Sequence, residues 1–77
     1  MKCTDYFKYV RLRPDRARIL DQWIEAAIAL PIREEVQADG RIRRWTFVDV
    51  EQKYLRVILL PDGETVHNAF FDRNFNP

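Results

Sequence analysis

Pairs of apolar residues recur four positions apart between Pro14 and Leu30, which is typical of one face of an amphipathic helix. The pattern predicts a single helix over residues 14–30, with an apolar face made of Ile19, Leu20, Trp23, Ile24, Ala27 and Ile28. Pro14 and Asp15 suit its first turn, where a proline gives up no helical hydrogen bond and a carboxylate meets the positive end of the helix dipole. Pro31 ends the helix because its ring cannot continue it.

The segment before this helix fits two structures. Thr4 suits the cap of a short helix that places Tyr6 beside Val10. Its alternate residues fit an edge strand equally. We expect the helix.

The second half of the chain alternates apolar and polar residues between three turn signals, which predicts a four-stranded antiparallel meander. The first signal is Asp39 with Gly40, and it predicts a two-residue hairpin in which both residues have positive φ. A loop at residues 50–53 is the second. The turn at residues 61–63 is the third, with Gly63 in a left-handed bulge. The predicted strands are residues 33–38, 41–50, 54–60 and 64–71.

Alternation along the last three strands divides their side chains between two faces of the sheet. The first is aliphatic and matches the apolar face of the helix, so we expect the helix to pack on it. Its members are Ile42, Val48, Leu55, Val57, Leu59, Ala69 and Phe71. The second, called here the aromatic face, collects Arg43, Trp45, Phe47, Tyr54, Arg56, Ile58, Val66, Asn68 and Phe70. One substantial helix cannot cover both faces, so the aromatic face is predicted to meet a protein, a nucleic acid or the N-terminal segment.

Length and composition limit the class of protein. The chain has 77 residues, enough for one domain with one core, residues 1–77. A net charge of +1 argues against a polybasic DNA binder, so any nucleic-acid contact must come from local clustering of cations. No apolar run or leader segment indicates a membrane span or export, so a cytoplasmic bacterial protein is expected. The single Cys3 has no partner for an internal disulfide.

The candidate chemical groups are few. His67 is the only histidine, and the predicted register places it on the aliphatic face opposite Val57. A lone histidine is more often structural than catalytic, and the nearby acids do not give it the spacing of a metal site. With two glycines the chain has no phosphate-cradling loop or nucleophile elbow, so no metal and no cofactor are expected. Proton transfer would fall to His67 or to one of the carboxylates Asp49, Glu64 and Asp72.

Three segments carry a family resemblance: RPDR before the helix, DGRIRRW at residues 39–45 and KYLRVILLPDGETVHNAFFDRNF at residues 53–75. Together with the order of helices and then a meander, they resemble small bacterial proteins similar to the BrnT and RelE/ParE-like toxins of type II toxin-antitoxin pairs. The resemblance implies metal-free cleavage of messenger RNA in active members, and an antitoxin that covers the active face. Carried over residue by residue, it points to Arg56, His67, Asn68 and Arg73. A net charge of +1 is lower than is common in such toxins, and many members have lost catalysis.

Two functions are therefore predicted as alternatives, both on an α+β fold with N-terminal helices on one face of the sheet. The first is a toxin-like, RNA-directed protein, a metal-free endonuclease with His67, Arg56 and Arg73 as catalytic residues. The second is a noncatalytic module that forms a homodimer or docks a partner through the aromatic face. The residues predicted to bind RNA or a partner are Arg43, Trp45, Phe47, Tyr54, Asn68 and Phe70.

Overall fold

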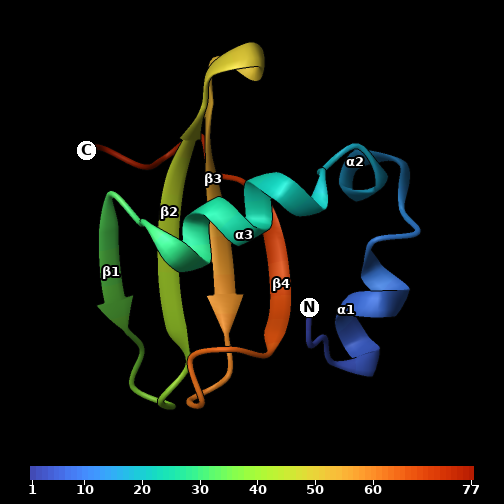
Figure 1. The fold of residues 1–77 in the computed structure, drawn as a ribbon, viewed down its shortest axis with the longest axis vertical. Coiled ribbons are helices and arrows are strands. Elements are labelled where there is room, and N and C mark those ends of the chain that lie inside the picture. Colours follow the sequence, from blue (N-terminus) through green and yellow to red (C-terminus); the bar gives the residue numbers. More distant parts are fainter.

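The computed structural model describes all 77 residues of an α+β fold (Figure 1). Its elements are α1 (Asp5–Val10), α2 (Pro14–Ala17), α3 (Asp21–Ala29), β1 (Arg33–Val36), β2 (Ile42–Val48), η1 (Asp49–Glu51), β3 (Lys53–Leu59) and β4 (Val66–Phe71). The four strands form one antiparallel sheet in the order β1-β2-β3-β4, which confirms the predicted meander. Helix α3 lies across one face of this sheet and contacts β2 and β3, while α1 contacts β4.

Helix α1 begins at the predicted cap. Thr4 Oγ1 accepts a hydrogen bond from the backbone N–H of Phe7 at 3.1 Å, so a first-turn donor that lacks a helical partner is satisfied. Phe7 and Val10 are buried, and Tyr6 is exposed. The helix predicted for this segment is confirmed.

The predicted helix over residues 14–30 is broken, and that prediction is wrong at its centre. Leu20 is extended, with ψ 144°, and it caps α3 instead of continuing α2. A guanidinium nitrogen of Arg11 donates to the carbonyl of Ile19 at 3.3 Å and to Asp21 Oδ1 at 2.6 Å, so contacts outside the segment hold the break. The break buries Ile19 and leaves Leu20 47% exposed, outside the apolar face to which the helical periodicity assigned it.

The turns of the sheet follow the sequence signals with one correction. Gly40 has φ +89°, but Asp39 has no positive φ, so the two-residue hairpin is wrong. The chain closes through a hydrogen bond from the N–H of Gly40 to the carbonyl of Gln37, with Gly40 in the left-handed position that follows a tight turn. Gln52 is also left-handed, at φ +54°, and Gly63 adopts the predicted left-handed conformation at φ +72°.

A bulge in the pairing of β3 with β4, at Ile58 and Leu59, moves two residues away from their predicted positions. Leu59 pairs with Val66, so Val66 is buried on the face that α3 covers, whereas alternation predicted the aromatic face. Ala69 is the residue opposite Val57, so the position predicted for His67 is also wrong. The extra residue in β4 shifts its alternation, which no pattern in the sequence marks.

The core lies between the sheet and the N-terminal helices. Its buried members are Phe7, Ile19, Ile24, Ala27, Val48, Leu55, Val57, Leu59, Val66 and Ala69. Trp23, Ile28, Ile42 and Phe71 pack against it. This confirms that the aliphatic face of the sheet meets the apolar face of α3.

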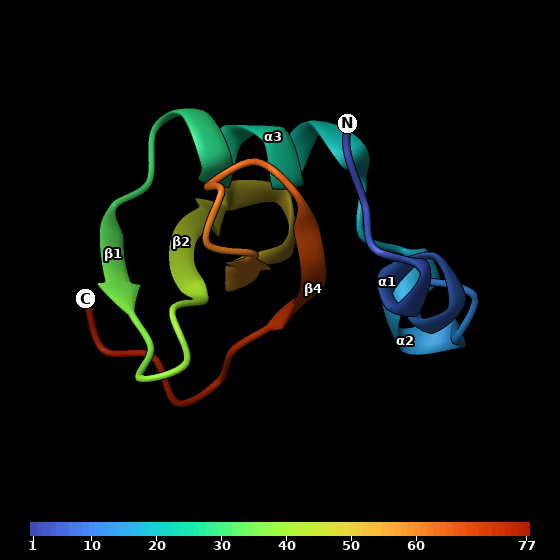
Figure 2. The ribbon, with the colours of Figure 1, turned by 90° about the horizontal axis from the view of Figure 1, so that it is seen from below.

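The C-terminal segment, residues 72–77, crosses the face of the sheet opposite α3 (Figure 2). Its Phe75 ring stacks on Trp45 with the ring centres 4.8 Å apart, and meets Tyr54 edge-on at 5.1 Å. Trp45 is therefore only 2% exposed, and the expectation that it lies open on the aromatic face is wrong. The covering segment is C-terminal instead of N-terminal, and Phe47 remains exposed beyond it.

Candidate functional site

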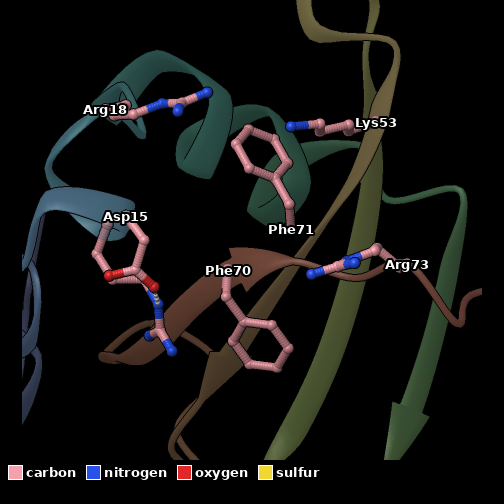
Figure 3. Close-up of a pocket in the computed structure, with 7 residues that line it drawn as sticks. Asp15, Arg18, Lys53, Phe70, Phe71 and Arg73 are labelled. Carbon is pink, nitrogen blue, oxygen red and sulfur yellow. Dashed lines mark hydrogen bonds and ion pairs between the residues drawn. The ribbon is translucent and has the colours of Figure 1, made fainter.

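A groove lies between α2 and the outer side of β4, with a volume of about 530 Å³ (Figure 3). Strand β4 supplies the aromatic wall of the groove. One charged wall comes from α2 and the residue after it. The other charged wall comes from the first residue of β3 and the C-terminal segment. The lining residues are Asp15, Arg16, Arg18, Lys53, Phe70, Phe71 and Arg73.

Four cations line the groove, and two of them have no acidic partner. Arg16 pairs with Asp15 at 3.2 Å and Arg18 with Glu51 at 3.2 Å. Lys53 and Arg73 form no ion pair, although nine of the thirteen Lys and Arg side chains of the protein do. The groove is thus a local concentration of uncompensated positive charge in a chain of net charge +1.

Two neighbouring rings of β4 reach the groove from opposite faces of the sheet. Phe70 lies on the aromatic face, between the guanidinium groups of Arg16 at 5.2 Å and Arg56 at 5.1 Å. Phe71 lies on the face that α3 covers, and the Lys53 ammonium sits 5.4 Å from its ring centre. The groove therefore wraps around the outer side of β4, and cations border both rings.

Asp72 anchors the C-terminal segment beside the groove. Its Oδ2 accepts hydrogen bonds from Trp45 Nε1 at 3.0 Å and from Arg56 Nε and Nη2 at 3.0 and 2.7 Å. Burial acts to raise the pKa of Asp72, but these bonds and one from the N–H of Asn74 outweigh it, so the pKa lies below its ordinary value. Asp72 is a carboxylate that neutralises Arg56.

His67 lies outside the groove, against α1. Its ring stacks on Tyr6 with the centres 4.9 Å apart, and its Nδ1 lies 3.2 Å from Thr4 Oγ1. The same hydroxyl accepts from the N–H of Phe7, and its contact with Nδ1 can form in either neutral tautomer of the ring. The pKa of His67 lies below its ordinary value, first because burial disfavours the charged ring and second because Arg41 repels it; Asp39 acts in the opposite direction.

The protein is expected to lose stability as the pH falls from about 7 through 6.5, the ordinary pKa of histidine. The folded-state pKa of His67 is lower than 6.5, so the unfolded chain binds the proton first and unfolding is favoured at lower pH. Urea unfolding followed across this window would measure the decrease in the free energy of unfolding. In the His67→Gln variant, which keeps a hydrogen-bonding partner for Thr4 without a titratable ring, the free energy of unfolding should not change over the same pH window. If this variant shows the same pH dependence as the wild type, a group other than His67 causes the effect.

The structure brings together only some of the residues predicted from sequence. Arg73 and Phe70 line the groove, and Asn68 joins it through a 2.7 Å hydrogen bond from Arg16 Nη1. Arg56 touches Phe70 but is paired with Asp72. The predicted residues that lie apart from the groove are Arg43, which is 3.8 Å from Glu35, the buried Trp45, the exposed Phe47, Tyr54 and His67.

Sequence reasoning missed five groove residues, of which Asp15 was expected only in the first turn of a helix. The predicted continuous helix leaves Arg16 and Arg18 off its apolar face; in the structure they lie at the end of α2 and just after it, before the break that precedes α3. Lys53 was placed in a loop. Phe71 was assigned to the aliphatic face, correctly, but its access to the groove depends on β4 being the outer strand at this point. The one local signal is the run RPDRAR, whose three arginines fall within six residues.

No group of three or more His, Cys, Asp or Glu side chains in the chain is arranged to hold a metal ion. None of the helices has the length and apolar character that crossing a membrane requires. Comparison of the chain with protein-family models, with curated proteins and with solved structures finds no match. The resemblance to BrnT and RelE/ParE-like toxins therefore stays a prediction from the sequence.

Proposed function

We propose that the protein binds single-stranded RNA in the groove between α2 and β4. The observation that carries this proposal is the position of Lys53 and Arg73, two cations without acidic partners, beside two aromatic rings in one cavity. Cations hold the phosphates of a nucleic-acid strand, and aromatic rings contact unpaired bases. Arg16 and Arg18 extend the charged track along the other wall.

The proposal covers binding and not cleavage. A metal-free ribonuclease needs a base and an acid within reach of the ribose 2′-hydroxyl and the leaving oxygen. His67 does not line the groove, and its Nδ1 is engaged with Thr4. Arg56 shares its charge with Asp72. Catalysis by His67, Arg56 and Arg73 in a toxin-antitoxin pair remains a separate prediction, which growth inhibition on expression would test.

The alternative, a noncatalytic module that docks through the aromatic face, has less support. Phe75 covers Trp45 and contacts Tyr54 on that face, and Phe70 is bordered by two guanidinium groups. Phe47, 40% exposed, is the one predicted docking residue that stays largely open. A homodimer or an antitoxin partner at this face remains a prediction.

Replacing both unpaired cations, as Lys53→Ala with Arg73→Ala, is expected to weaken binding of a short single-stranded RNA by about 10-fold or more. The salt dependence should change as well: two lost phosphate contacts make the slope of log affinity against log salt less steep by about 1.4. Fluorescence anisotropy of a labelled RNA, titrated at several salt concentrations, measures both quantities.

A matched control removes two cations elsewhere. Lys2 and Lys8 are exposed, pair with Glu64 and Asp5, and line neither the groove nor its walls. Lys2→Ala with Lys8→Ala therefore gives the same net charge as the groove variant, and we expect it to keep the affinity and the salt slope of the wild type. Equal losses in the two double variants would reduce the effect to net charge, and wild-type binding by the groove variant would exclude the proposed site.

A further inference from the structure

A second cavity adjoins the groove between the start of β3 and the C-terminal segment, with a volume of about 260 Å³. It shares Lys53, Phe71 and Arg73 with the groove, so the two unpaired cations stand at the boundary between the cavities. The lining residues that belong to the second cavity alone are Gln52, Tyr54, Asp72 and Phe75. A ligand held at the boundary can therefore extend into both.

The walls of the second cavity are aromatic. Tyr54, Phe71 and Phe75 line it, and all three side chains are only partly buried, so each keeps surface for a further contact. Tyr54 and Phe75 already meet edge-on at 5.1 Å, which fixes their rings relative to each other. Rings in this arrangement favour a flat, aromatic guest through offset or edge contacts.

The polar groups of the second cavity distinguish a base from a phosphate. Both oxygens of Asp72 are already engaged, Oδ2 by Trp45 and Arg56 and Oδ1 by the N–H of Asn74. Gln52 Nε2 donates to the carbonyl of Asp49 at 2.7 Å, so its Oε1 is the atom left for a ligand. Gln52 thus offers an acceptor oxygen, which suits an N–H group on the edge of a nucleobase. The cations of the groove suit the phosphate.

We propose that the second cavity holds one unpaired base of a nucleic-acid strand whose neighbouring phosphate lies between Lys53 and Arg73. The inference rests on the proposed function and adds a base site to it. A base in a duplex is stacked and paired, so its edge and faces cannot enter a cavity of this size. The ligand is therefore a strand with unpaired bases, and the contribution of the base is separable from that of the backbone.

The test compares three oligonucleotides of equal length and equal charge: single-stranded RNA, single-stranded DNA of the same sequence, and a DNA backbone from which every base is absent. The wild type should bind the two base-bearing strands about 5-fold to 100-fold more tightly than the strand without bases, which is the range expected for contact between a base and aromatic side chains. The RNA and DNA arms then report whether the 2′-hydroxyl adds affinity.

Tyr54→Leu removes one aromatic wall and keeps apolar volume. It should lower the affinity for the base-bearing strands by about 5-fold and leave the affinity for the baseless strand unchanged. Tyr9→Leu is the matched control, because it makes the same change of side chain at a residue that is 73% exposed and lines neither cavity. It should bind all three strands as the wild type does.

The outcomes separate this inference from the proposed function. If the wild type binds the baseless strand as tightly as the others, while Lys53→Ala with Arg73→Ala still weakens binding, the base site is excluded and the phosphate groove stands. If Tyr9→Leu and Tyr54→Leu lose the same affinity, the base site is excluded as well. If no strand binds, both the groove and the base site are overturned.

Discussion

Asp72→Ala is expected to lower the free energy of unfolding by about 3 kcal/mol, which is a large share of the roughly 4–12 kcal/mol available to a chain of this length. The substitution leaves the indole N–H of the buried Trp45 without an acceptor and the guanidinium of Arg56 without its counter-charge. Because about a quarter of the Arg56 side chain is exposed, solvent compensates it in part, so the expected loss is at the lower end for a broken buried pair. Urea unfolding at neutral pH measures it.

Two further variants separate the charge of Asp72 from its hydrogen bonds. Asp72→Asn keeps an oxygen that can accept from Trp45 and removes the charge, so its loss should be smaller than that of Asp72→Ala. Arg56→Ala combined with Asp72→Ala should cost less than the sum of the single losses, because the two residues share one ion pair. A loss below about 1 kcal/mol in Asp72→Ala would mean that the C-terminal segment is not anchored as described.

The sheet could be predicted from the sequence because its turns and strands are marked by residues that lie within or next to them. Gly40 and Gly63 take the left-handed backbone that the turns need, and the strands between them alternate over the predicted stretches. The register of β2 against β3 differs from the prediction by two residues, because the loop spans residues 49–52 and not 50–53, so Trp45 pairs with Arg56 and not with Ile58. A shift of two keeps Trp45 and Arg56 on the face to which alternation assigned them. The signal for the start of α1 is local in the same sense, because Thr4 caps the helix that begins one residue later.

The errors arise where distant residues decide the structure. Arg11 holds the Ile19 carbonyl out of the helix, and this contact cannot be seen in the periodicity of residues 14–30. The bulge in β4 depends on its pairing with β3 and moves Val66 into the core. Phe75 reaches Trp45 across thirty positions of sequence. Each of these contacts satisfies polar groups or buries apolar surface area. The local pattern of apolar and polar residues does not show where such a contact is made.

The candidate site was predictable only in its chemistry. The sequence indicated arginine and aromatic residues on the last strands, and Arg73 and Phe70 do line the groove. Its position could not be predicted, because the wall formed by Arg16 and Arg18 depends on the break between α2 and α3. Helix α2 buries no side chain of its own, so the 2.7 Å hydrogen bond from Arg16 to Asn68 is one of the few contacts that fix this wall to β4.

Phe7→Ala is expected to cost about 4 kcal/mol, because it removes a fully buried ring from the core and leaves a cavity between α1 and β4. The Arg11 guanidinium lies 5.1 Å from the centre of this ring, and Arg11 stabilises the break between α2 and α3. The loss of stability should therefore extend to α2, which forms one wall of the groove. Thermal unfolding measures the stability. Tyr9→Ala, on the same helix but 73% exposed, is the control and should change it by less than about 0.5 kcal/mol. Similar losses in both variants would contradict the packing of α1 through Phe7, since only the buried ring can leave a cavity.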